Sequence, residues 1–199
     1  MRFFKSRKNT VEKIKEATFE LLSTKGYAQI SMRDIAQKAK IALGQVTYYY
    51  RTKEKLIISV FDEMIETFIS EMKQRINNSS DKLGEITRFF EEIYESEDKV
   101  YRVLIDFTAQ SLWNEKLRER ITNLFEKITS TIEEIYREYG VNKSEAEMKA
   151  KLYISNVYGT AIQKILSKEN NSFNKIVDYQ KSIVKKERKL LNAKANALL

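Results

Sequence analysis

Apolar residues recur at helical spacing along most of the chain, and no segment shows the alternation that is typical of a β-strand. The most informative segment is residues 31–53, which predicts two short helices joined by a tight turn. Ser31 and Asp34 have the spacing of a capping box, in which the hydroxyl accepts a free backbone N–H and the carboxylate reaches back to the cap residue. A helix is therefore expected to begin at Met32. Its buried face comprises Ile35, Ala36 and Ala39.

A second, very short helix is expected after the turn. Gly44 is expected to free the backbone at its start, and Val46 and Tyr50 form its buried side. The other side chains offer an amide, a hydroxyl and two phenols to solvent: Gln45, Thr47, Tyr48 and Tyr49. Basic side chains flank this surface: Arg33, Lys38, Lys40, Arg51 and Lys53. Amides and hydroxyls can read base edges while Lys, Arg and Tyr hold phosphates, so the pattern favours DNA binding. An ordinary helical hairpin with a solvated polar face is the alternative.

The segment from Ile14 to Leu56 resembles the N-terminal domain of the TetR (tetracycline-repressor-like) family of transcriptional regulators. The residues that carry the resemblance are Ala17, Gly26-Tyr27, Ser31, Ile35-Ala36, Ala39, Gly44 and Tyr50-x-x-Lys53-Glu54-x-Leu56. The rest of the chain is similar to the family only in being helical and of the usual length. This resemblance implies that the following residues contact DNA: Ser31, Arg33, Gln45, Thr47, Tyr48, Tyr49 and Lys53.

Three positions depart from the family pattern. Lys40 stands where the family usually has the turn glycine, so a non-glycine residue is asked to adopt a positive φ at a cost of about 1–2 kcal/mol. Ala42 replaces the usual hydroxyl cap of the second helix, and Thr47 replaces a tyrosine that commonly touches phosphate. The framework of the motif is intact in spite of these changes.

Composition narrows the possible functions. The 199 residues can bury a sizeable core, and the absence of Pro together with only 5 Gly favours an all-helical fold. The absence of Cys and His excludes disulfides and thiolate metal sites and removes the commonest general base. We therefore expect no metal, no cofactor and no enzyme activity. Carboxylate chemistry is the enzymatic alternative, although paired acids such as Glu91-Glu92 fit exposed faces.

No apolar run approaches the roughly 20 residues of a membrane span, and the apolar pair near the start is too short for a signal-peptide core. A cytoplasmic protein with no membrane partner is expected. Its charge is unevenly distributed, because residues 1–56 carry 13 Lys and Arg against 5 Asp and Glu. That excess of 8 equals the net charge of the whole chain, +8, so the remainder is balanced. A phosphate-binding segment attached to a neutral domain would have this distribution.

The predicted fold is all-α, with about nine helices in two domains. Residues 1–52 are expected to form a three-helix helix-turn-helix DNA-binding domain, and residues 53–199 a helical effector-binding and dimerisation domain. The first helix should run from a cap at Asn9 or Thr10 to Gly26, and Asn9 and Glu12 have the spacing of a capping box. Lys53 to about Ile76 has no helix breaker and predicts one long helix that could link the two domains. Further helices are expected at about 81–95, 98–112, 115–139, 144–168 and 172–192.

The second predicted domain is rich in aromatic residues on the expected inward faces of its helices. The candidate ligand-binding residues are Phe68, Phe89, Phe90, Tyr94, Phe107, Gln110, Trp113 and Phe125. Such side chains can line a cavity for an amphipathic or flat apolar effector, and they can equally pack an ordinary helical core. The family resemblance favours the cavity but does not name the ligand.

The last two predicted helices suggest self-association. The candidate dimerisation residues are Asn156, Gly159, Ala161, Gln163, Ile176 and Ile183. Small and amide side chains permit close helix approach, and a terminal helix with an apolar stripe needs a partner. That partner is either the protein's own core or, as the resemblance implies, a second copy across a two-fold axis.

The sequence as a whole predicts a homodimeric, ligand-responsive transcriptional regulator. We expect a repressor that binds palindromic double-stranded operator DNA and is released by a small amphipathic or aromatic effector. An effector-independent structural DNA-binding protein of the same fold is the alternative.

Overall fold

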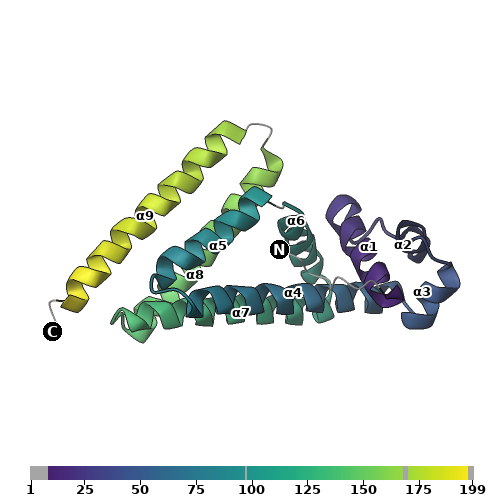
Figure 1. The fold of residues 1–199 in the computed structure, drawn as a ribbon, viewed down its shortest axis with the longest axis horizontal. Coiled ribbons are helices and arrows are strands. Elements are labelled where there is room, and N and C mark those ends of the chain that lie inside the picture. Colours follow the sequence, from purple (N-terminus) through teal and green to yellow (C-terminus); the bar gives the residue numbers. More distant parts are fainter. Residues whose placement is uncertain (1–8, 97, 168–169, 197–199) are drawn as a thin grey trace. The chain divides into compact units, whose positions relative to one another are not determined.

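A computed structural model describes residues 9–96, 98–167 and 170–196. Within these ranges the chain forms nine α-helices and no strand, which confirms the all-α prediction (Figure 1). The helices are α1 (Thr10–Lys25), α2 (Met32–Ala39), α3 (Leu43–Tyr49), α4 (Lys53–Asn77), α5 (Lys82–Ser96), α6 (Asp98–Ser111), α7 (Glu115–Glu138), α8 (Lys143–Leu166) and α9 (Asn170–Asn196). Among the described residues, no helix combines the length and the apolar composition that crossing a bilayer requires.

The ends of the first two helices follow from local side-chain chemistry. Capping boxes begin both helices, formed by Asn9 with Glu12 and by Ser31 with Asp34, as predicted. Gly26 ends α1 with a φ of 77°, in the region that favours glycine. Lys40 ends α2 in the left-handed conformation, with a φ of 56°.

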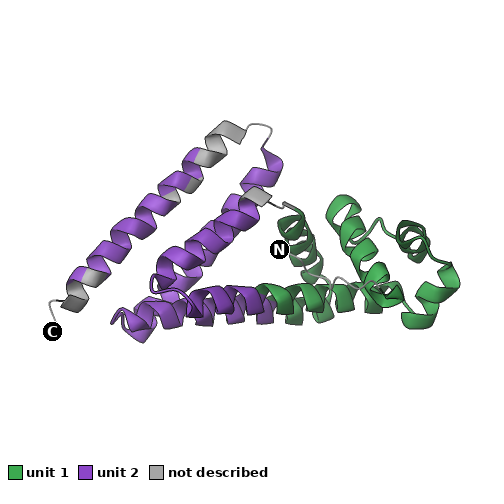
Figure 2. Cartoon of the chain, in the orientation of Figure 1, with its two compact units in different colours: residues 1–68, 99–121 green, residues 69–98, 122–199 purple. Residues whose placement is uncertain are grey.

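The helices form two compact units (Figure 2). Unit 1 comprises residues 1–68 and 99–121, and unit 2 comprises residues 69–98 and 122–199. Unit 1 therefore contains α6 and the start of α7 in addition to the helix-turn-helix segment. Helices α4 and α7 each contribute residues to both units. The expected boundary between residues 52 and 53 is a different division of the chain and stays a prediction.

An aromatic pair lies at the centre of unit 1. The rings of Phe61 on α4 and Phe107 on α6 are stacked, with 4.1 Å between their centroids and 21° between their planes. Both side chains are fully buried. Removal of such large apolar surfaces from water is a main source of stability, and the stacked rings fix α6 against α4.

In unit 2, α8 packs through small buried residues, Ala146 and Ala150. Helix α9 buries Leu191 and is also joined to its neighbours by ion pairs. Ion pairs join Lys181 to Glu91 on α5 and Glu187 to Lys149 on α8, at 3.3 and 2.6 Å. A third joins Arg188 to Asp81. Several large apolar side chains of α8 and α9 are exposed: Met148, Leu152, Leu166, Ile176, Tyr179, Ile183 and Leu190.

Candidate nucleic-acid interface

Helix α3 buries one side chain and offers the others to solvent. Val46 is fully buried, whereas Gln45, Thr47, Tyr48 and Tyr49 are exposed, as the sequence predicted. The two phenol rings meet edge to face at 5.2 Å, with Tyr48 81% and Tyr49 46% exposed. This packing restricts the two rings without covering them, so a polar and aromatic surface is fixed before any partner binds.

The expected role of Gly44 in freeing the backbone is wrong. Gly44 lies inside α3, and the positive φ of the turn is at Lys40 instead. The chain has therefore completed its reversal before it reaches the glycine. A Cβ at Gly44 would have no other atom within 4 Å. The glycine thus leaves open space on the exposed side of α3.

Thr47 and Ala42 behave differently from their counterparts in the family pattern. The Thr47 hydroxyl donates to the carbonyls of Leu43 and Gly44, at 3.2 and 3.1 Å, so its proton is used within the helix. Its oxygen can still accept a hydrogen bond from a base or a water molecule. Ala42 provides no side-chain cap for α3.

The start of α2 is held by the predicted capping box. The backbone N–H of Ser31 donates to Asp34 at 2.8 Å, and that of Asp34 donates to the Ser31 hydroxyl at 3.2 Å. The Ser31 hydroxyl also donates to the carboxylate, and this bond is the main reason that the pKa of Asp34 is lowered. Arg33 and Lys38 are exposed on the same helix. The position of these two cations therefore depends on a well-defined helix start.

Lys53, expected at a phosphate, is half-buried and bound inside unit 1. Its Nζ donates to the carbonyls of Tyr27 and Ile30, at 3.1 and 3.0 Å, and lies 5.1 Å from the Tyr27 ring centroid. Two of its three N–H groups are thus used by the loop before α2. A cation as the first residue of α4 opposes the helix dipole, and this is the sequence signal that could have indicated a structural role.

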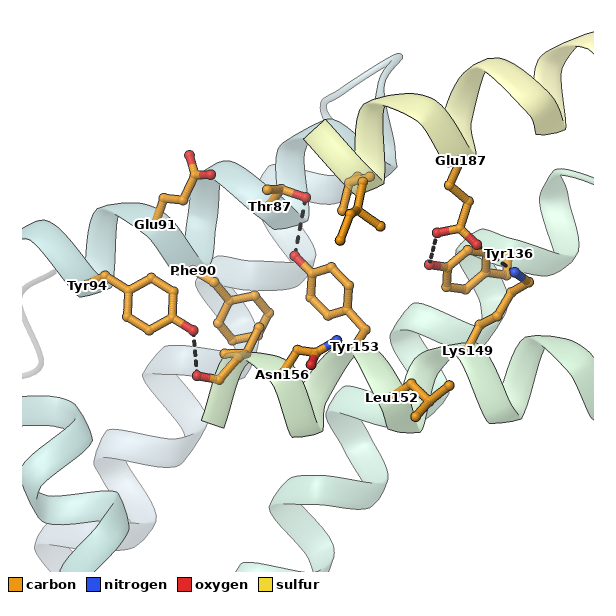
Figure 3. A pocket seen from close by; sticks show the side chains of 13 residues that line it. Thr87, Phe90, Glu91, Tyr94, Tyr136, Lys149, Leu152, Tyr153, Asn156 and Glu187 are labelled. Atoms are coloured by element: carbon orange, nitrogen blue, oxygen red, sulfur yellow. Dashed lines mark hydrogen bonds and ion pairs between the residues drawn. The ribbon is translucent and has the colours of Figure 1, made fainter. Parts of the chain in front are cut away.

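Only some of the candidate ligand-binding residues lie at a cavity. Phe90 and Tyr94 line a partly open cavity of about 230 Å³ within unit 2 (Figure 3). Phe125 lines a separate, more open hollow between α7 and α8, where its ring meets that of Tyr158 at 5.6 Å.

The other aromatic candidates are either core or surface residues. Phe68, Phe89 and Phe107 are buried at 4%, 1% and 0% exposure. Gln110 donates to Asp106 at 3.4 Å, and Trp113 is 82% exposed. The candidate set is also divided, because Phe68, Phe107, Gln110 and Trp113 belong to unit 1 and the others to unit 2. Helical periodicity identifies an apolar face but cannot tell which compact unit that face enters.

The sequence analysis missed the polar residues of the unit 2 cavity. At one end, Glu187 accepts hydrogen bonds from the Tyr136 hydroxyl at 3.0 Å and from Lys149 at 2.6 Å. The Tyr153 hydroxyl donates to Thr87 at 3.2 Å (Figure 3). Burial raises the pKa of both phenols, so they stay protonated and act as donors. Glu91 and Asn156 also line the cavity, and the rest of its wall is aromatic or aliphatic, which makes the cavity amphipathic.

The candidate dimerisation residues have different environments. Ile176 and Ile183 are 37% and 47% exposed, and Gln163 is exposed. A Cβ added at Gly159 would have no other atom within 4 Å, so this position is open. Ala161, by contrast, is only 1% exposed and belongs to the core of unit 2. Of the set, Asn156 and Ile183 also line the unit 2 cavity.

Comparisons with known proteins find similar sequences for the helix-turn-helix segment. Residues 14–60 match the model of the family described as "Bacterial regulatory proteins, tetR family". A curated relative, the fatty acid metabolism regulator protein of Bacillus subtilis, is 30% identical over 76 residues, which are 38% of this chain. The match spans 39% of that relative's length.

Solved structures are similar over most of the chain. A TetR transcriptional regulator from Legionella pneumophila has a TM-score of 0.75 at 22% identity, with 92% of this chain and 99% of that chain covered. A transcriptional regulator from Saccharomonospora viridis in complex with choline has a TM-score of 0.79 at 15% identity, with 88% and 95% covered. At these identities the likeness shows a shared fold.

The capping box of α2 gives a prediction about pH. Ser31→Ala removes the main cause of the lowered pKa of Asp34, so that pKa should rise part of the way to its ordinary value. Stabilisation by ionised Asp34 is present above the ordinary pKa and is lost as the pH falls through the lower folded-state pKa. The variant should therefore lose less stability on acidification. An NMR titration of the Asp34 carboxyl carbon measures the shift; Thr24→Ala is the control, and an unchanged Asp34 pKa in Ser31→Ala would contradict the box.

Proposed function

Because the chain is a transcriptional regulator of the TetR type, we propose that it is a homodimeric repressor that binds a palindromic operator and is released by a small amphipathic effector. The observation that carries the proposal is the exposed face of α3, with an amide and two phenols beside exposed cations. Such a face can enter the major groove, where Gln45 reads a base edge while Arg33 and Lys38 bind phosphates. Gly44, with open space where a Cβ would be, allows the backbone to approach the DNA closely.

A selection from a random duplex library tests the DNA-binding proposal. The preferred site should be a palindrome with half-sites about one helical turn, or a multiple of it, apart. Gln45→Ala should change the preferred bases, at a cost of about 1–3 kcal/mol on the original site. Arg33→Ala should weaken binding to all sequences and flatten the log–log salt slope by about 0.9. Lys151→Ala, an exposed cation of α8, is the control, and unaltered base preferences in Gln45→Ala would refute the role given to α3.

The exposed apolar side chains of α8 and α9 support the dimer. They lie on two helices that ion pairs join to each other and to α5, and exposed apolar surface of this kind is typical of an interface. A second copy that covers it through a two-fold axis would place two recognition helices on one duplex. Ile176, Tyr179 and Leu190 are the side chains of this set that lie on α9 and do not line the cavity.

Ile176→Asp should therefore dissociate the dimer, because the pair of copies would bury an unpaired charge. We expect the dimer dissociation constant to rise by about tenfold or more, and operator affinity to fall with it. Sedimentation velocity at several protein concentrations measures the change. Trp113→Asp, at an 82% exposed position in unit 1, is the matched control. A monomeric unmodified protein at micromolar concentration would remove the dimer proposal.

The unit 2 cavity is the proposed effector site. It combines aromatic and aliphatic walls with a charged end at Lys149 and Glu187, which suits a small molecule that has an apolar part and a polar group. The names of similar proteins suggest probes of this kind: medium-chain fatty acids, after the fatty acid metabolism regulator, and choline, after the choline complex. Helix α4 has residues in both units, so a change at its unit 2 end can alter the orientation of its unit 1 end.

Effector and operator should then weaken each other by the same factor, with a coupling of about 1–3 kcal/mol. Calorimetric titration of fatty acids and choline, with and without the selected operator, measures this factor. Asn156→Leu, which changes the polarity of the cavity wall, should alter ligand affinity without changing operator affinity in the absence of ligand. Asn123→Leu, at an exposed position of α7 that does not line the cavity, is the matched control. Equal ligand affinities in the two titrations would favour an effector-independent DNA-binding protein instead.

A further inference from the structure

The loop between α1 and α2, residues 26–31, is held by side chains from two other helices. This loop sets the orientation of α2 relative to α1, and α2 packs against both α1 and α3. Within the loop, Ile30 is a core residue with 3% exposure, whereas Ala28 and Gln29 are exposed. Its path is therefore fixed by few apolar contacts, and its backbone polar groups need partners from elsewhere.

Lys53 at the start of α4 supplies the partner for the carbonyl groups. Its ammonium group binds the carbonyls of Tyr27 and Ile30 at 3.1 and 3.0 Å, which joins the two ends of the loop. Hydrogen bonds that involve a charged donor are stronger than those between neutral groups.

Asp106 on α6 supplies the partner for the N–H group. Its Oδ2 accepts the backbone N–H of Tyr27 at 2.6 Å, and its Oδ1 accepts from Gln110 at 3.4 Å. A Cβ at Gly26 would lie 3.3 Å from Oδ2, so the glycine makes the close approach possible. Seventy-nine positions separate Asp106 from Tyr27 in the sequence.

Tyr27 thus has its C=O bound by a cation and its N–H bound by an anion. Its ring is held as well, because it meets the buried ring of Phe107 edge to face at 5.9 Å and lies beneath Lys53. Phe107 is the next residue to Asp106 on α6 and is stacked on Phe61 of α4. The loop is therefore attached to the same aromatic pair that joins α6 to α4.

We infer that Asp106 is a positioning residue for operator binding: with Lys53 it fixes the backbone of Tyr27 and so the orientation of α2 and α3. The inference rests on the proposed DNA binding, and it adds a residue of α6 that lies outside the helix-turn-helix segment. Loss of the carboxylate would leave the Tyr27 N–H without this partner and let the loop sample other conformations. The exposed face of α3 would then meet a duplex in several orientations, which harms base recognition more than phosphate attraction.

Three variants test the inference. Asp106→Ala removes the acceptor, Asp106→Asn keeps an oxygen acceptor without the charge, and Asp62→Ala removes a carboxylate from another ion pair of unit 1, with Arg120 at 2.8 Å. Affinities are measured for the operator selected by the unmodified protein and for a scrambled duplex of equal length. Asp106→Ala should lower operator affinity by about tenfold, the factor that loss of a charge-assisted hydrogen bond supplies. Its affinity for scrambled DNA should stay within about twofold of the unmodified value, because that binding depends on exposed cations that the substitution leaves in place. All three variants remove one negative charge, so a general charge effect would appear equally in each of them.

Asp106→Asn should restore most of the operator affinity, and Asp62→Ala should change neither affinity more than about twofold. A role in general stability would instead lower both affinities by the same factor, and that result would overturn the inference. So would an unchanged operator affinity in Asp106→Ala.

An NMR measurement on the unmodified protein keeps the test independent of folding in the variants and of the operator. The Tyr27 amide proton should be shifted downfield and exchange slowly, because it is bonded to a carboxylate. Rapid exchange at the rate of an exposed amide would overturn the Asp106 contact itself. If that signature is present but the unmodified protein selects no operator, the proposed function fails while the contact stands.

Discussion

Helices α2 and α3 contain 8 and 7 residues, and helices of this length are not stable in water by themselves. The proposed DNA-binding surface therefore depends on tertiary packing. Ile35, Ala36 and Val46 are buried within unit 1, and the capping box at Ser31 fixes where α2 begins. The face that α3 offers to solvent has a defined direction only because these contacts hold two helices that would otherwise unfold.

Tertiary contacts also decide which cations of the first 56 residues are available to a partner. The excess of 8 positive charges suggests a surface devoted to phosphate, yet several of the cations have internal partners. Lys53 binds two backbone carbonyls, and Lys15 binds Glu63 on α4 at 2.5 Å. Arg33 and Lys38 remain exposed. Fewer cations are thus available to bind phosphate than the charge count suggests, and Arg33 and Lys38 offer theirs beside α3.

In unit 2, one helix serves two proposed roles. Helix α9 is held by ion pairs on one side, and it leaves apolar side chains exposed on another. Ile183 belongs to that exposed set and also lines the cavity. A second copy placed on this face would therefore cover part of the cavity rim. Under the proposed function, dimer formation and effector binding would act on the same residues, which makes some coupling between them a physical consequence of the fold.

The sequence by itself determined the elements of this protein, because helix formation and capping depend on residues three or four positions apart. The capping boxes at Asn9 and Ser31, the helix end at Gly26 and the buried Val46 are all local patterns that the structure confirms. Lys40 adopts the left-handed conformation that its position in the turn demanded.

Tertiary structure alone decided which distant side chains meet. Periodicity marked Phe90 and Phe107 as inward-facing, but it could not place one at a cavity and the other in a core. The contact of Asp106 with Tyr27 has no local signature, because its 79-residue separation is closed only when α6 packs on α4. Short-range spacing thus determined the helices and their caps, whereas the long-range packing of apolar surfaces determined the cavity and the support of the recognition helix.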